Sequence, residues 1–193
     1  MISLINEYVV LLDACVLLPI SLTDLLLRLA EDPAIYAPRW SRDILNEVER
    51  NLQLPKFGLS PEKARYRIAC MESAFPEAMV TGYEPFIEKM ENHESDRHVL
   101  AAAVRTKADA ILTSNSKDVP LSCLEPFGIE RLTPENFLLH QWSLDSNLVS
   151  KKLRDQAEDV DRTLDSLLDL LGRWSLGLLT RPRRLKTSNR ETN

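Results

Sequence analysis

The feature of this sequence that most constrains its fold is a short apolar run that ends on an acidic residue. Val9–Leu12 is entirely apolar and half β-branched, which is typical of a strand buried on both faces of a parallel sheet. Asp13 follows directly, and a carboxylate at a buried strand end is costly unless it has partners. We therefore predict a central strand whose carboxyl end carries functional chemistry.

Strand-like and helix-like segments alternate along the first three quarters of the chain. Four more short apolar segments, the first of them stopped by Pro38, predict strands at residues 34–37, 78–81, 110–113 and 128–132. Between them lie stretches of helical periodicity. Their predicted N-caps are Ser21 or Thr23, Ser41, Ser60 before Pro61, Ser95–Asp96, and Thr133 before Pro134. This alternation is typical of βαβ units. It predicts an α/β fold over residues 1–142, a three-layer sandwich with a central parallel sheet.

The pattern changes in residues 143–193, which we interpret as a C-terminal extension. Apolar residues recur every three or four positions between Asn147 and Leu171, which predicts one amphipathic helix of about six or seven turns. Its apolar stripe packs either on the sheet domain or on a second copy of the chain; the alternative is a helix exposed for a partner protein. The last segment, Arg181–Asn193, holds five basic residues and one acid. This segment is predicted to be a disordered terminus that keeps the protein soluble. The alternative is that its basic side chains bind RNA phosphates.

The composition narrows the class of protein. The chain has 193 residues and a net charge of -5, and its acidic excess lies outside the basic tail. An acidic body of this kind is not typical of a duplex-binding protein. Three cysteines without a C-x-x-C pair favour neither a disulfide framework nor a four-ligand zinc site, and they point to the cytoplasm. No apolar run approaches the ~18 residues of a membrane span, and no signal peptide is expected.

Four oxygen-bearing side chains are candidates for one shared site. Asp13 and Asn115 follow predicted strands, Asp96 starts a helix, and Glu47 lies in the helix after the second strand. In parallel sheets, ligands bind beyond the carboxyl ends of the strands. Carboxylate and amide oxygens suit hard cations such as Mg²⁺ and Mn²⁺. The simpler alternatives are a first-turn acid favoured by the helix dipole for Asp96, and a solvated helix face for Glu47.

The segment from His93 to His98 invites comparison with a zinc motif. Its two histidines are five residues apart, one more than the H-E-x-x-H spacing, so they do not share a helical face. We expect surface or helix-edge imidazoles there. Nucleotide-binding glycine motifs and a G-x-S-x-G elbow are absent from the sequence.

Four segments, taken together, resemble the motifs of a PIN domain. They are VLLDACVL at residues 10–17, PRWSRDILNE at 38–47, SDRHVLAAA at 95–103 and ILTSNSKD at 111–118. They occur in the order and spacing of that family. Their residues are similar to those of VapC-type toxins of bacterial toxin–antitoxin pairs. The resemblance covers about residues 8–140, and the C-terminal helical extension resembles one VapC branch.

This resemblance implies a metal-dependent ribonuclease that cuts single-stranded or looped RNA. The family's three acids fall on Asp13, Glu47 and Asp96, which the resemblance makes catalytic and metal-binding, with Mg²⁺ or Mn²⁺ as the cofactor. The fourth catalytic position is often Asp in the family but is Asn115 here. The site is therefore expected to bind either one metal ion or two. Asp118, three residues on, is expected either to compensate for the Asn115 amide or to serve as a structural acid, as its matching position often does, and Thr113 matches a hydroxyl near the site.

The resemblance also implies two partners, an RNA substrate and a small antitoxin protein. A homodimer is a further possible arrangement, and no membrane association is expected. Asn115 supplies a neutral oxygen where the family often has a carboxylate. That departure favours an alternative function, a catalytically inactive PIN-like module that binds RNA or protein.

Overall fold

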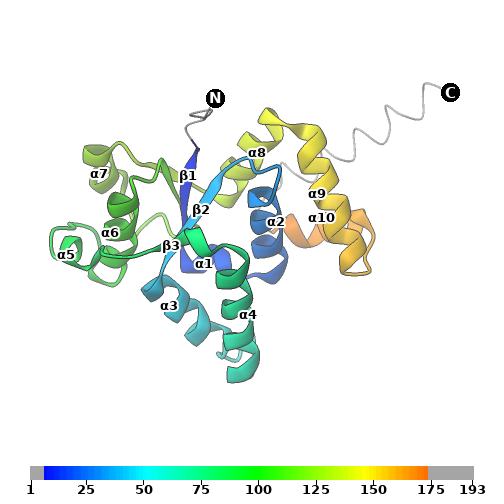
Figure 1. Cartoon of the computed structure of the whole chain (residues 1–193), viewed down its shortest axis with the longest axis horizontal. Helices are drawn as coiled ribbons and strands as arrows, with labels where there is room; N and C mark the ends of the chain where they lie inside the picture. The colour runs from blue at the N-terminus through cyan, green and yellow to red at the C-terminus, as the bar shows by residue number, and fades with distance from the viewer. Residues whose placement is uncertain (1–6, 174–193) are drawn as a thin grey trace.

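A five-stranded parallel sheet forms the centre of the computed structural model, which describes residues 7–173 (Figure 1). Its strand order is β3-β2-β1-β4-β5, and every neighbouring pair is parallel. The strands are β1 (Val9–Leu12), β2 (Ala37–Ser41), β3 (Met79–Val80), β4 (Ala110–Leu112) and β5 (Glu130–Leu132). The run that opens the sequence is therefore the central strand, and Val10, Leu11 and Leu12 are completely buried.

Helices cover both faces of this sheet, so the predicted three-layer α/β sandwich is confirmed. In Figure 1, α6 and α7 lie on one side of the strands, while α2, α8 and α9 lie on the other. The α-helices are α1 (Ala14–Leu17), α2 (Ile20–Ala30), α3 (Arg42–Leu52), α4 (Pro61–Ala74), α5 (Glu84–Ile87), α6 (Arg97–Thr106), α7 (Leu121–Leu124), α8 (Pro134–Leu144), α9 (Ser146–Asp159) and α10 (Leu164–Leu171). Within residues 7–173, the short 3₁₀ turns are η1 (Pro76–Ala78), η2 (Glu94–Asp96) and η3 (Glu125–Phe127). No helix of the described residues is long and apolar enough to cross a membrane.

Strand β2 differs from its prediction, which placed it at residues 34–37 and stopped it at Pro38. The strand instead begins at Ala37 and includes Pro38. The nitrogen of Ala37 donates to Tyr8 on the β1 side, so the nitrogen of the next residue faces the opposite edge. Pairing with β3 on that edge starts only at Trp40, and the missing N–H of proline therefore interrupts no hydrogen bond.

Side-chain caps start three of the helices where the sequence predicts them. The hydroxyl oxygens of Ser41, Ser60 and Thr133 each accept a hydrogen bond from the backbone nitrogen three residues later, at 3.2, 3.4 and 3.2 Å. The predicted cap of α2 at Ser21 or Thr23 is wrong. That helix begins at Ile20, and the buried Thr23 hydroxyl donates to the Pro19 carbonyl at 3.0 Å.

The single long helix predicted over residues 147–171 is also wrong, because α9 and α10 are separate. Asp161, between them, has a left-handed backbone with φ 51°, a conformation that breaks a helix. Thr163 then caps α10 by accepting from the nitrogen of Ser166 at 3.2 Å. Apolar periodicity continues through the break because both helices bury their stripes in the same core, and so the pattern conceals the turn.

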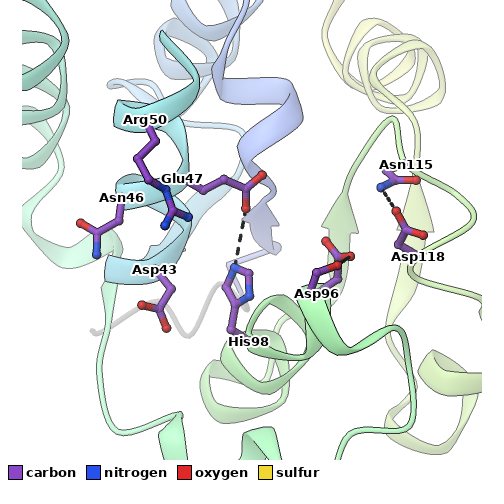
Figure 2. Close-up of a pocket in the computed structure, with 9 residues that line it drawn as sticks. Asp43, Asn46, Glu47, Arg50, Asp96, His98, Asn115 and Asp118 are labelled. Carbon is purple, nitrogen blue, oxygen red and sulfur yellow. Dashed lines mark hydrogen bonds and ion pairs between the residues drawn. The ribbon is translucent and has the colours of Figure 1, made fainter. Parts of the chain in front are cut away.

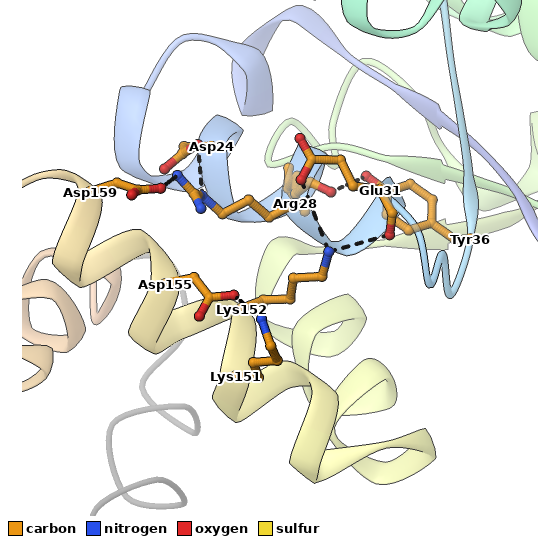
Figure 3. A network of polar contacts seen from close by, with 9 residues as sticks. Asp24, Arg28, Glu31, Tyr36, Lys151, Lys152, Asp155 and Asp159 are labelled. Carbon is orange, nitrogen blue, oxygen red and sulfur yellow. Dashed lines mark hydrogen bonds and ion pairs between the residues drawn. The ribbon is translucent and has the colours of Figure 1, made fainter.

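The C-terminal helices pack on the sheet domain, the first of the arrangements expected for them. Helix α9 lies against α2 and α8, and its Val149 and Leu153 are completely buried. Figure 3 shows the polar contacts at its junction with α2, where Arg28 pairs with Asp24 at 3.1 Å and with Asp159 at 2.8 Å. The predicted tail at residues 181–193 lies outside the described residues.

Candidate active site

The candidate site lies at the carboxyl end of the sheet, where the topology changes direction. The chain runs from β1 outward through β2 to β3 and then returns to the other side of β1 with β4. In open parallel sheets such a switch point is where ligands bind. The nitrogen of Asp13, just after β1, donates to the carbonyl of Leu112 at the end of β4 at 3.1 Å. The segments that carry Asp13 and Asn115 therefore leave the sheet side by side.

Asp13 is only 6% exposed and is held by two donors on one oxygen. Its Oδ2 accepts from the Thr113 hydroxyl at 2.6 Å and from the Cys15 thiol at 3.1 Å. Burial and the neighbouring Asp13 carboxylate raise the pKa of the Cys15 thiol to about 12, so the thiol remains a proton donor. Because both hydrogen bonds fall on Oδ2, the second oxygen of Asp13 remains the one available to another partner.

A polar cleft of about 510 Å³ opens beside this buried acid. Its walls come from three segments: one face of α3, the start of α6, and the loop after β4 (Figure 2). The lining residues are Asp43, Asn46, Glu47, Arg50, Ser95, Asp96, His98, Asn115 and Asp118. The structure thus brings Glu47, Asp96 and Asn115 together, as the sequence predicted. Asp13 and Thr113 do not line the cleft, since both are buried.

Charge links the buried acid to the cleft. Burial, followed by the Asp13 and Asp96 carboxylates, raises the pKa of Glu47, while His98 and Arg50 act in the opposite direction. Two carboxylates that raise the pKa of a third form a site where a cation is favoured. The donor set therefore fits a divalent ion bound by carboxylate oxygen.

Asp96 occupies the N-cap position of α6 but makes no capping hydrogen bond with its side chain. The prediction that Ser95–Asp96 caps this helix is therefore wrong for the side chains. The Asp96 carboxylate instead accepts from the Ser95 hydroxyl at 2.6 Å and lies in the cleft wall. A capping role would turn the carboxylate toward the helix, so its absence leaves Asp96 free to meet a ligand.

Asn115 and Asp118, in the loop after β4, form a hydrogen-bonded pair. The side-chain amide of Asn115 donates to Asp118 Oδ2 in a short hydrogen bond (Figure 2). Its backbone nitrogen donates to Thr113 Oγ1 at 2.9 Å. Asn115 therefore links the hydroxyl that holds Asp13 to the carboxylate that completes the cleft wall, and Asp118 is the acid on this side.

Sequence reasoning missed five residues of the cleft: Asn46, Arg50, Ser95, His98 and Asp43. Helical spacing could have found the first two, because they lie three and seven residues after Asp43 on the face that carries Glu47. His98 was expected at a surface or helix edge, yet its side chain is 15% exposed. Its Nε2 is buried without a hydrogen bond and lies 4.0 Å from Glu47 Oε2.

His93 lies at the outer edge of the cleft wall. One of its ring nitrogens, one oxygen of Asp96 and one oxygen of Asp118 all lie within 4.8 Å of one another. This set joins the segment before α6 to the loop after β4. No sequence motif predicts this set, because the spacing from His93 to Asp118 matches no metal motif.

A parallel sheet with acids gathered at its switch point is the arrangement expected of a PIN domain. The chain is similar to a curated protein, "Putative ribonuclease VapC50" of Mycobacterium tuberculosis (strain ATCC 25618 / H37Rv), with 41% identity over 111 residues. The match covers 56% of this chain and 66% of that protein, slightly less than two thirds of its length. No family model and no solved structure matches the chain. The similarity therefore extends to one VapC-type protein over 111 residues of this chain.

Proposed function

We propose that this protein is a metal-dependent endoribonuclease that hydrolyses phosphodiester bonds of single-stranded or looped RNA. The observation that carries the proposal is the convergence of Asp13, Glu47 and Asp96 at the switch point, with the charge of one raising the pKa of another. The ribonuclease name of the M. tuberculosis relative supports the same reaction.

Asp13, Glu47 and Asp96 are the proposed ligands of a Mg²⁺ or Mn²⁺ ion. An ion bound there supplies Lewis acidity, which activates water and offsets negative charge on a phosphodiester. Thr113 and Cys15 hold one oxygen of Asp13, so they orient the other oxygen for the ion. Asp118, fixed by the Asn115 amide, provides a further carboxylate at the cleft wall.

Arg50 is proposed to hold the RNA backbone. It is exposed and is the one Arg or Lys among the residues that line the cleft, all of which lie in the described part of the chain. A guanidinium at the rim of an acidic cleft attracts the phosphates that carboxylates repel. Its place on the same α3 face as Glu47 aligns a phosphate contact with the acids.

The biological role we propose is that of the toxin in a toxin–antitoxin pair, acting in the cytoplasm and bound by a small antitoxin protein. The similarity to the VapC-type protein of M. tuberculosis supports this role. Growth arrest on expression of the wild type, relieved by loss of Asp13, is the expected cellular result.

A non-catalytic PIN-like module that binds RNA or protein is the second candidate. Asn115 favours it, because a neutral amide stands where an acid would strengthen ion binding. Metal affinity separates the two: a nuclease centre binds Mn²⁺ in a way that changes at Asp13 weaken, whereas a non-catalytic module shows no such dependence.

Cleavage assays of purified variants test the proposal. We expect Asp13→Ala and Asp96→Asn each to lose at least about 100-fold in the rate of single-stranded RNA cleavage, and chelation by EDTA to abolish cleavage by the wild type. The matched control is Asp24→Asn, which removes an acid paired with Arg28 on the far face and is expected to cleave normally. Circular dichroism checks that each variant is folded. Undiminished cleavage by Asp13→Ala would overturn the assignment.

A further inference from the structure

We propose that His93 supplies an imidazole ligand to the cleft ion of the proposed function, with Asp96 and Asp118 as the carboxylate ligands beside it. On this proposal the site takes a first-row transition ion such as Mn²⁺ in preference to Mg²⁺. The inference rests on the proposed metal-dependent function and specifies which ion that function uses.

The geometry brings three donors to one point from two separate segments. His93 precedes η2, Asp96 ends it, and Asp118 lies in the loop after β4. Their ligand atoms lie within 4.8 Å of one another. Neighbouring ligands of an octahedral ion with bonds of about 2.1 Å are separated by about 3 Å, and opposite ligands by about 4.2 Å. Small side-chain rotations therefore suffice to close the three donors around an ion.

The imidazole is free to make that movement. The His93 side chain is 66% exposed, so no core packing fixes its rotamer. Its Nδ1 lies 2.8 Å from the Ser95 hydroxyl oxygen and 3.9 Å from Asp96 Oδ2. The Ser95 hydroxyl also donates to Asp96. A hydroxyl partner is neutral and readily replaced by a cation, because the cation attracts both the imidazole nitrogen and the carboxylate oxygen.

The donor set explains why an imidazole is useful at this position. Asn115 provides an amide where a carboxylate would add charge, and that amide already donates to Asp118 Oδ2. The loop side of the cleft therefore has one carboxylate, with one oxygen engaged. A neutral imidazole adds a donor without adding another negative charge beside Asp96.

The same chemistry sets the ion preference. Imidazole nitrogen binds first-row transition ions well, whereas Mg²⁺ prefers oxygen and retains its waters. A site that adds one imidazole to its carboxylates therefore favours Mn²⁺ over Mg²⁺ more than a site of carboxylates alone. Without His93 the remaining oxygen donors discriminate less between the two ions.

Mn²⁺ binding to the full-length protein tests the proposal, with free Mn²⁺ measured by its EPR signal. We expect His93→Ala to weaken Mn²⁺ binding by at least about 10-fold while Mg²⁺ binding, measured by competition, changes less. The control is His140→Ala, which removes an exposed histidine of α8 that lines a different cavity and is expected to leave both affinities unchanged.

Pulsed EPR of the Mn²⁺ form distinguishes coordination by His93 from an indirect effect through Ser95. The wild type and His140→Ala are expected to show ¹⁴N modulation from a bound imidazole, and His93→Ala is expected to lose it. Modulation that persists in His93→Ala but disappears in His98→Gln would assign the nitrogen to His98 and overturn the inference. Wild-type affinity in His93→Ala would overturn it as well.

The same measurements separate this inference from the proposed function. If the wild type binds Mn²⁺ and Asp13→Ala abolishes cleavage, but His93→Ala binds as the wild type does, only the inference fails. If the wild type binds no divalent ion and its cleavage survives EDTA, the metal-dependent function fails and the inference with it.

Discussion

Two charged regions of this molecule differ in how their charges are paired. At the junction of α2 with α9, cations and anions alternate: Arg28 lies between Asp24 and Asp159, and Lys152 reaches Glu31 at 4.0 Å (Figure 3). In the cleft, carboxylates from three segments face one another with Arg50 at the rim (Figure 2).

The difference shows what each region does. Paired charges at a helix junction satisfy one another, so they help to position α9 but have no affinity left for a ligand. At the cleft, the Asp13 and Asp96 carboxylates raise the pKa of Glu47, and this repulsion between like charges destabilises the ion-free protein. Such an arrangement persists where a ligand of opposite charge offsets it. The number of acidic residues does not distinguish the two regions. What distinguishes them is whether each acid is paired with a cation.

The largest effect is expected in the α9 region. Leu153→Ala empties a completely buried position and should lower the free energy of unfolding by about 2–5 kcal/mol, measured by urea denaturation. Mn²⁺ affinity of the folded variant should stay at the wild-type value, because the cleft uses none of these contacts. A parallel loss of Mn²⁺ affinity would show that the packing of α9 and metal binding in the cleft are energetically coupled.

Metal addition should stabilise the protein through the cleft alone. At a free Mn²⁺ concentration of 100 times Kd, one bound ion adds about 2.7 kcal/mol to the free energy of unfolding. Asp13→Ala should lose most of this gain, while Arg28→Ala, which disrupts only paired charges, should keep all of it. Urea denaturation with and without Mn²⁺ measures the gain. An equal gain in Asp13→Ala would place the ion elsewhere.

The smallest effect concerns pH in the presence of EDTA. The pKa of Glu47 is raised in the folded protein, so the native state binds this proton more tightly than the unfolded chain does. The contribution of Glu47 to stability therefore increases as pH falls through its folded pKa and is lost as pH rises. Glu47→Gln should flatten the stability–pH curve just above the ordinary pKa of a glutamate, about 4.3. An unchanged curve would mean that the shift does not affect folding.

Much of the fold could be predicted because local rules and tertiary packing agree. A β-branched apolar run is stable only as a buried strand, and the hydroxyl of Ser41 satisfies the first turn of α3 wherever that helix packs. The errors occurred where tertiary contacts override a local rule. Pro38 lies inside β2 because its nitrogen faces an unpaired stretch. Residue Asp161 breaks a helix whose apolar pattern continues on both sides.

The sequence by itself determined which residue types could form a site and on which elements they lie. Asp13 after a buried strand, Glu47 on a helix and Asp96 at a helix start follow from the order of the chain, since each depends on its near neighbours. Only the tertiary structure decided what these residues meet. Thr113 holds the first acid from another segment, and His93 lies near Asp118 across the cleft wall. Such contacts between distant residues depend on the strand order and the loop conformations, which the packing of the whole chain determines.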